Sequence, residues 1–205
     1  MIVLKTGREL KIMKEACSIS AGALEAAGKA VEPGVTTAEI DRLAEEYIRR
    51  RGGEPNFKNY EGYAATFACG DVSPEAKRLM DTTRESLYEG IHAACAGGRI
   101  GDIGHAVQSY VEARGYSVVR EFVGHGVGTH LHEAPEVPNF GTPGRGIRLM
   151  PGMTIAIEPM VNAGGYDVKV QPDGWTVLTK DGSLSAHFEN TIVITADGPK
   201  IMTVV

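Results

Sequence analysis

A helix-pair pattern occurs twice in this chain, and the repeat restricts the folds that are open to it. Moving the sequence by 63 residues places seven positions of the first pattern on matching positions of the second. Recurrence of the same residue types at a fixed offset is the signature of a duplicated structural unit. The repeat therefore predicts two related halves, each built around a pair of helices. The matched positions are Leu24/Leu87, Gly34/Gly97, Ile40/Ile103, Tyr47/Tyr110, Ile48/Val111, Arg51/Arg114 and Gly52/Gly115.

Local signals indicate where these helices begin and end. The segments Thr6–Glu9 and Thr36–Glu39 match the capping box, in which the Thr hydroxyl and the Glu carboxylate each satisfy a free backbone N–H group. Helices are therefore predicted to start there, and the second is expected to end before Gly52. A serine followed by proline in Ser73–Glu75 predicts a third helix start. A fourth helix is expected from about Asp102 to Arg114.

Segments with the composition of strands lie mainly in the second half. Their connections are short, which favours antiparallel pairing. The first half contains one such segment, Tyr63–Cys69. We therefore predict an α+β fold in one domain, residues 1–205, with a helical first half (1–72) and a helix pair plus sheet in the second (73–205). The predicted strands, which are β-branched and bounded by Gly, Pro or Asp, are Ser117–Val123, Thr154–Glu158, Trp175–Thr179, His187–Thr195 and Lys200–Val205.

The overall composition excludes several classes of protein. The net charge is -5, and Lys and Arg form no dense block, which argues against a nucleic-acid-binding protein. No run approaches the roughly 20 apolar residues that span a bilayer, so no membrane association is expected. The 3 cysteines lie far apart without a C-x-x-C spacing, which fits reduced thiols. A cytoplasmic protein is predicted.

The stretch EFVGHGVGTHLHE, Glu121–Glu133, contains three histidines and two acids. His125 ends a predicted strand, and the glycines on both sides allow another backbone or a substrate to approach closely. His130 is interpreted as a solvated loop residue. His132 lies in a segment whose Pro and Gly content indicates a shaped loop. The stretch therefore offers His125 as a candidate metal ligand and His132 as a candidate functional residue.

Two further carboxylates lie in segments that read as buried strands. Alternation places Glu158 on one face with Ala156, and it places Glu189 on one face with His187 and Thr191. A carboxylate buried alone is costly, so such groups are usually paired, protonated or bound to a cation. Either acid alone is also explained by an Arg or Lys partner or by an exposed sheet face. Together with His125, the two acids form a ligand set suited to Mn, Fe, Co or Zn.

The chain contains several long and ordered motifs. They are FKNY, SPEAKRLMDTTRESLYEGI, GYSVVREFVGHGVGTHLHEAPEVPNF, LMPGMTIAIEPMVNAG and DGWTVLTKDGSLSAHFENTIVIT. These motifs closely resemble the bacterial type I methionine aminopeptidases, and the resemblance covers nearly the whole chain. It implies the "pita-bread" fold, in which two pseudo-symmetric α/β halves surround a metal site. Such symmetry would account for the repeat.

The resemblance implies roles for individual residues. His125, Glu158 and Glu189 match three of the family's five metal ligands, and Glu189 matches the carboxylate that bridges two metals. His132 matches the catalytic histidine that contacts the substrate amide and helps to stabilise the transition state.

The resemblance also implies a pocket for the methionine side chain. Tyr60 and Trp175 match walls of this pocket, although from the sequence alone Trp175 reads equally well as core. Leu131 stands at a wall position where the family often has Phe, so a looser pocket edge is expected.

The chain departs from the family pattern between Tyr60 and Ala64. Several tens of residues are absent there, including two Asp ligands and a substrate histidine. One imidazole and two carboxylates cannot fully ligate two metals, so at most one divalent ion is expected to be well held. The join has no linker composition, which fits a deletion or an unrecorded segment as well as a naturally short chain.

The expected function is metal-dependent removal of N-terminal methionine from nascent chains, at the ribosome, with activity impaired by the missing ligands. Hydrolysis by a single metal with open positions remains chemically feasible. The alternative is a non-catalytic module of the same fold that binds peptides or the ribosome.

Overall fold

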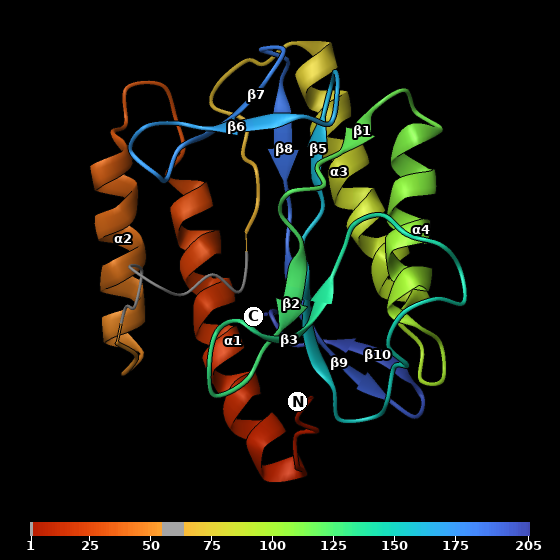
Figure 1. The fold of residues 1–205 in the computed structure, drawn as a ribbon. Helices are drawn as coiled ribbons and strands as arrows, with labels where there is room; N and C mark the ends of the chain where they lie inside the picture. Colours follow the sequence, from red (N-terminus) through yellow and green to blue (C-terminus); the bar gives the residue numbers. More distant parts are fainter. Residues whose placement is uncertain (1, 55–63) are drawn as a thin grey trace.

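The computed structural model of the chain describes residues 2–54 and 64–205. Four helices lie in these residues, in the order expected from the repeat (Figure 1). They are α1 (Gly7–Lys29), α2 (Thr37–Arg50), α3 (Pro74–Ala93) and α4 (Ile100–Glu112). The strands are β1 (Ser117–Val118), β2 (Gly124–Gly126), β3 (Glu133–Val137), β4 (Thr154–Ile157), β5 (Met160–Asn162), β6 (Val168–Val170), β7 (Val177–Thr179), β8 (Ser185–His187), β9 (Asn190–Thr195) and β10 (Gly198–Ile201).

These strands form antiparallel sheets in the second half of the chain. A five-stranded sheet has the order β10-β9-β4-β2-β3, a three-stranded sheet has the order β1-β5-β8, and β6 pairs with β7. The pair α1 and α2 lies to one side of the strands, and the pair α3 and α4 lies to the other side (Figure 1). The predicted α+β class and the antiparallel pairing are confirmed.

The two helix pairs share details that follow from the repeat. In each half an arginine lies over the ring of the matched tyrosine, Arg51 on Tyr47 at 5.0 Å and Arg114 on Tyr110 at 3.4 Å from the ring centre. Glycine tolerates positive φ, which other residues rarely adopt. The matched glycines have such values in both halves, 100° at Gly34 and 90° at Gly97, and 77° at Gly52 and 82° at Gly115.

The helix starts follow the capping signals. Thr6 and Thr36 both form complete capping boxes, and Ser73 caps α3 by accepting a hydrogen bond from the backbone of Ala76. The fourth helix begins two residues before the predicted Asp102. The reason is that the Asp102 carboxylate accepts a hydrogen bond of 2.7 Å from the Arg99 N–H, so Arg99 becomes the cap.

Residues 64–69, the described part of a predicted strand, form no strand, so that prediction was wrong. The segment still lies beside the region of β8. The Ala64 carbonyl accepts a hydrogen bond from the Glu189 N–H at 2.9 Å. The Thr66 hydroxyl accepts from the His187 N–H at 2.9 Å and donates to the His187 carbonyl at 3.0 Å. The Thr66 hydroxyl thus makes the two hydrogen bonds to His187 that the backbone of a neighbouring strand would make in a regular β-ladder.

Several predicted strands are shorter than expected. Of Ser117–Val123, only the first two residues form strand β1, and Trp175 lies in a bend before β7. The predicted strand His187–Thr195 is interrupted at residues 188 and 189. The predicted Lys200–Val205 corresponds to β10, which begins earlier and ends at Ile201.

The main core lies between α3, α4 and the five-stranded sheet. Ile103, Ile155, Ile157, Ile192 and Ile194 are fully buried there. The α1–α2 contact is built on small residues and contains a cluster of three buried alanines. None of the described helices is long and apolar enough to cross a membrane. The cysteines Cys17, Cys69 and Cys95 are free, and burial raises the pKa of the Cys17 thiol to about 11.

Candidate metal centre

The candidate ligands lie where two paired strands change from one sheet to the other. Strands β4 and β9 pair in one register, and β5 and β8 continue the same register beyond a short interruption. Glu158 and Glu189 are therefore opposite each other within the interruption. Pro159, which follows Glu158, has no N–H to donate to a ladder, which explains why regular pairing stops there. Opposed residues of an antiparallel pair share a face, so both carboxylates point the same way.

His125 reaches this face from the neighbouring strand. Strand β2 pairs with β4 through Gly126 and Ile155, which sets His125 opposite Ala156. Alternation along β4 puts Ala156 and Glu158 on one face. Three strands that are far apart in the sequence thus direct one imidazole and two carboxylates to a common point.

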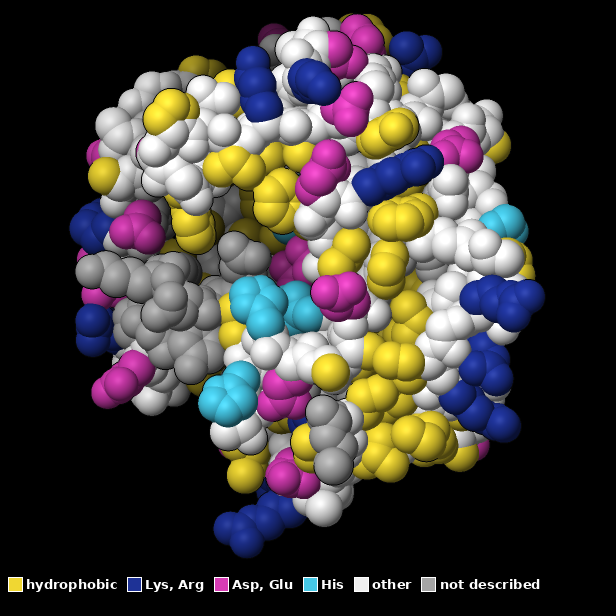
Figure 2. Space-filling model, viewed as in Figure 1, with side chains coloured by type: hydrophobic (Ala, Val, Ile, Leu, Met, Phe, Trp, Pro, Cys, Tyr) yellow, Lys and Arg dark blue, Asp and Glu magenta, His cyan; other side chains and the backbone are white. Residues whose placement is uncertain are grey.

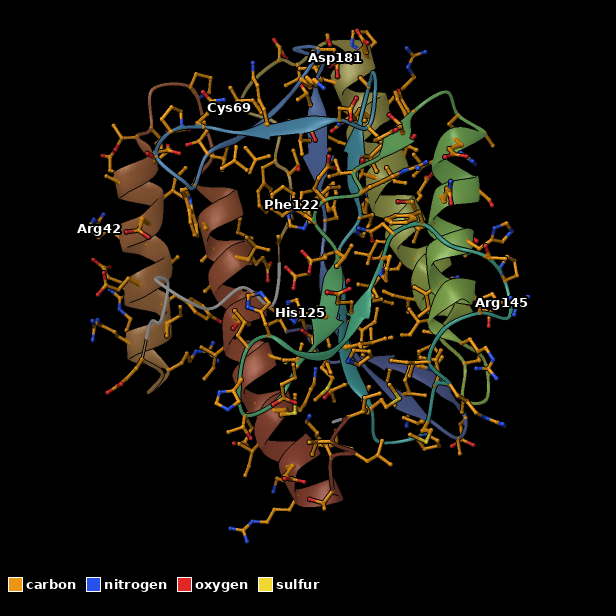
Figure 3. All side chains as sticks on the ribbon, in the orientation of Figure 1. Arg42, Cys69, Phe122, His125, Arg145 and Asp181 are labelled. Carbon is orange, nitrogen blue, oxygen red and sulfur yellow. The ribbon has the colours of Figure 1, made fainter. Side chains whose placement is uncertain are left out.

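The three groups form a compact, buried cluster. One ligand atom from each of His125, Glu158 and Glu189 lies within 4.8 Å of the others. Their exposed fractions are 7%, 4% and 1%. His125 Nε2 is 3.6 Å from Glu158 Oε1, which is longer than a hydrogen bond. Figure 3 labels His125 near the centre of the molecule.

The protonation geometry of His125 fits metal binding. Its Nδ1 lies 2.8 Å from the Gly126 carbonyl oxygen, which accepts and therefore places the ring proton on Nδ1. Nε2 then carries the lone pair, and it is buried without a hydrogen-bond partner among the described residues. Metal-binding histidines are typically oriented in this way by a hydrogen bond from their other nitrogen. The cluster can therefore hold a divalent cation.

Glycines on both sides of His125 allow β2 to pack tightly. A methyl group at Gly124 would overlap the carbonyl oxygen of Ala156, and one at Gly126 would overlap that of Ala134. The glycines thus allow neighbouring backbone segments to pack closely against β2. This is one of the two roles that the sequence predicted for them.

Replacing Gly124 with alanine is expected to destabilise the fold by about 1–3 kcal/mol, because backbone atoms must move to admit the methyl group. Urea unfolding followed by circular dichroism measures this change. Gly7→Ala provides a matched control, since nothing lies within 4 Å of the added carbon and Gly7 begins α1. Equal unfolding midpoints for Gly124→Ala and the parent would show that β2 is not tightly packed.

His132 lies beside His125, with ring centres 4.2 Å apart in an edge-to-face arrangement. It borders a cavity of about 760 Å³, together with Glu158, His187, Met160 and Trp175. Most of the wall is apolar, and Figure 2 shows a hollow lined by hydrophobic side chains with histidine and acidic side chains at its edge. The cavity thus connects the cluster with a pocket for an apolar group.

The predicted pocket residues have different positions in the structure. Trp175 borders the cavity, although 74% of its surface is exposed. Leu131 is half-buried and is not among the residues that line this cavity, so its place in a pocket wall stays a prediction. Tyr60 lies outside the described residues. His130 is exposed.

His187 borders the cavity and faces Glu158, although it was not among the candidate residues predicted from the sequence. Its Nε2 lies 3.6 Å from Glu158 Oε2. The available signal was the strand alternation, which placed His187 on one face with Glu189.

A buried ion pair anchors the loop that carries His132. Lys5 Nζ donates to Glu133 Oε2 at 2.7 Å, and both side chains are largely buried. The Glu133 carboxylate also accepts from the His130 N–H at 3.1 Å. Burial alone raises the pKa of Glu133, but the hydrogen bonds from Lys5 and His130 outweigh it and hold the pKa below its usual value.

The Lys5→Met variant is expected to be less stable by about 1–3 kcal/mol at neutral pH, because Glu133 loses its partner while still partly buried. A lowered carboxyl pKa contributes stability above the unfolded value, and this contribution is lost as the pH falls through the folded value. The difference between parent and variant should therefore shrink below a pH of about 4.5. Urea unfolding at pH 7 and pH 4 tests this, and a difference that is the same at both pH values would contradict it.

Comparison with protein families supports this assignment of a metal site. The model of metallopeptidase family M24 matches residues 11–65 and 59–196. The match therefore falls into two pieces that meet near residue 60, close to the predicted position of the missing segment.

The chain is also similar to individual proteins over its full length. It is 43% identical to a methionine aminopeptidase of Clostridium perfringens and 42% identical to methionine aminopeptidase 1 of Bacillus subtilis, covering at least 99% of each. The first match spans 248 residues against 205 in this chain, so several tens of residues of that relative have no counterpart here.

Solved structures give the same result. The crystal structure of methionine aminopeptidase from Thermotoga maritima matches with a TM-score of 0.94 and 37% identity, and all of both chains is covered. A prolidase from Pyrococcus furiosus matches with a TM-score of 0.76 at 19% identity, over 99% of this chain and 66% of the prolidase, and shares the fold. The chain therefore belongs to metallopeptidase family M24 and, within it, to the methionine aminopeptidase group with the pita-bread fold.

Proposed function

We propose that this chain removes the N-terminal methionine from peptides and nascent proteins, with a divalent metal held by His125, Glu158 and Glu189. The observation that carries the proposal is the buried His125 Nε2, which has its lone pair free and faces Glu158 at the edge of an apolar cavity. Nascent chains are made in the cytoplasm, where we expect this protein to act, at the ribosome.

The donor set suits Mn, Fe, Co or Zn, because it combines an imidazole with carboxylate oxygens. A bound ion would lower the pKa of a water and polarise the scissile carbonyl. The protein's own contribution is to hold three ligands in fixed register and to leave the cavity side open to the substrate. One well-held ion is the proposed state, since the described residues provide three ligand groups in the cluster.

The cavity supplies the means to bind and orient the substrate. Its apolar wall is suited to a methionine side chain, and Met160, Trp175 and Glu158 are among the residues that line the cavity. His132 also lines the cavity, next to the His125 ring. We assign it to donate a hydrogen bond to the substrate amide, where it stabilises the negative charge that develops on the carbonyl oxygen.

Methionine release from a peptide that begins Met-Ala tests the function directly. Apo protein supplied with Mn²⁺ or Co²⁺ should release free methionine, and a chelator should stop the release. A blocked Nα-acetyl peptide serves as the negative substrate. Absence of methionine release under every metal condition, from a protein that is folded by circular dichroism, would overturn the proposal.

A non-catalytic peptide-binding module is the second candidate. The observation that favours it is the shorter length of this chain relative to its methionine aminopeptidase relatives. Fluorescence titration of Trp175, the only tryptophan, with a Met-Ala peptide discriminates between the two. Binding that is unaffected by the chelator and is not followed by release favours the module.

A further inference from the structure

The loop that carries His132 is tied to the sheet at its start. It spans residues 127–132, between β2 and β3. The Val127 N–H donates to the Thr154 carbonyl at 3.0 Å, and the Val127 carbonyl accepts from the Thr154 hydroxyl at 2.5 Å. His132 lies at the other end of the loop, so its position depends on what holds that end.

The Glu133 carboxylate holds the end of the loop that contains His132. Its Oε1 accepts from the His130 N–H at 3.1 Å, and its Oε2 accepts from Lys5 Nζ at 2.7 Å. The side chains of Lys5 and Glu133 are only 7% and 16% exposed. A methyl group at Gly128 would overlap both carboxylate oxygens and the Lys5 ammonium group, so the pair packs directly against the loop backbone. His132 lies between His130 and Glu133, inside the short turn that this carboxylate closes.

Lys5 is fixed in turn by the strands that flank the candidate ligands. The Lys5 N–H donates to the Gly152 carbonyl at 2.8 Å, and the Gly152 N–H donates to the Ile194 carbonyl at 2.9 Å. Gly152 lies just before β4, and Ile194 belongs to β9. A continuous series of contacts therefore runs from these two strands through Lys5 to the loop.

We propose that Lys5 and Glu133 are positioning residues for the reaction, and that the buried pair holds His132 at the cavity, beside the His125 ring. Neither Lys5 nor Glu133 is among the described residues that line the cavity, so both act through the loop. The inference rests on the role proposed above for His132. It makes the first residues of the chain, which are distant from the ligands in the sequence, part of the active site.

The expected effect is large because a hydrogen bond to a reacting group tolerates little displacement. A shift of about 1 Å can reduce a rate by about 100-fold. Loss of the Lys5 ammonium group leaves Glu133 partly buried without its counter-charge, which favours movement of the carboxylate towards water. Because the same carboxylate holds the His130 N–H, this movement would carry the loop with it.

Lys5→Met tests the inference, because methionine keeps the length of the buried side chain and removes its charge. With a Met-Ala peptide we expect kcat to fall by about 10- to 100-fold, and KM and the Mn²⁺ affinity to stay within about threefold of the parent. Lys5→Arg, which keeps the charge, should recover most of kcat. The assays are run at a temperature at which circular dichroism shows every variant to be folded.

Lys14→Met is the matched control. Lys14 Nζ donates to the Met202 and Val204 carbonyls at 2.8 and 3.2 Å, so its bonds hold the C-terminal segment instead of the loop. This variant is expected to keep the kcat of the parent. An equal fall in kcat for the two lysine variants would overturn the inference.

A double-mutant cycle separates the positioning of His132 from a general loss of structure. In a His132→Ala background, Lys5→Met should leave kcat unchanged within about twofold, because no imidazole remains to be held. The same fall in kcat in both backgrounds would contradict the proposal. Gly128→Ala is a second variant, since its methyl group displaces the pair without altering any charge, and it should reproduce the effect on kcat.

Amide hydrogen exchange of the apo protein gives a readout that does not use activity. Lys5→Met should increase exchange in residues 127–133 and leave β4 and β9 as protected as in the parent. Unchanged exchange in this loop would overturn the inference, whether or not the parent releases methionine. A parent without methionine release, whose loop still exchanges faster in Lys5→Met, would remove the proposed function but support the link from Lys5 to His132.

Discussion

His125→Ala is expected to lower the affinity for the first metal ion by about 100-fold or more and to abolish measurable methionine release. Changes to groups that merely orient a ligand already cost about 10–100-fold in affinity, and this variant removes a ligand outright. It also leaves Glu158 and Glu189 as two buried acids without the imidazole that completes the cluster.

Calorimetric titration with Mn²⁺ and a methionine-release assay measure the two effects of this variant. His130→Ala is the control, because it removes an imidazole from the same loop region without entering the cluster. A His125→Ala protein that binds as much metal as the parent, with the same affinity, would contradict the assignment of the centre.

His132→Ala is expected to reduce kcat by about 100- to 1000-fold while leaving the metal affinity unchanged. Removal of one hydrogen-bond donor to a developing oxyanion typically has an effect of this size. His132 contacts the His125 ring but does not belong to the ligand cluster, which is why the two variants are expected to differ.

Steady-state kinetics with a Met-Ala peptide and a Mn²⁺ titration together test this second variant. His132→Gln should recover part of kcat, because its amide can donate a hydrogen bond. A loss of metal affinity equal to that of His125→Ala would instead identify His132 as a ligand.

The helical part of the fold was accessible from the sequence because its signals are local. A capping box spans only four residues, so Thr6 and Thr36 directly predicted the starts of α1 and α2. The fourth helix was misplaced by two residues because its cap is formed by Asp102 acting on the backbone of Arg99, a pattern without Ser or Thr.

The sheet was less predictable, since most strands are too short to show an alternating pattern. β2 has three residues, of which two are glycine, and β3 contains Pro135. Their extended conformation depends on pairing, of β2 with β4 and of β3 with β2, and β4 lies in a distant part of the chain.

The candidate ligands could be predicted from local sequence patterns, but their relative positions depend on pairing between distant strands. Alternation identified Glu158 and Glu189 as inward-facing acids, but that they lie opposite each other depends on the register of β4 with β9. His187 had the same alternation signal, and only the structure shows that it faces Glu158. Leu131 was expected in the pocket wall from the resemblance alone, because the family often has Phe at that position, and this stays a prediction.

The strand pairing that aligns the candidate ligands lies entirely within the second half of the chain. His125, Glu158 and Glu189 all come from that half, and its strands pair with one another. The register of β4 with β9 and of β5 with β8 sets the two carboxylates opposite each other. The geometry of the cluster is therefore separable from the length of the first half.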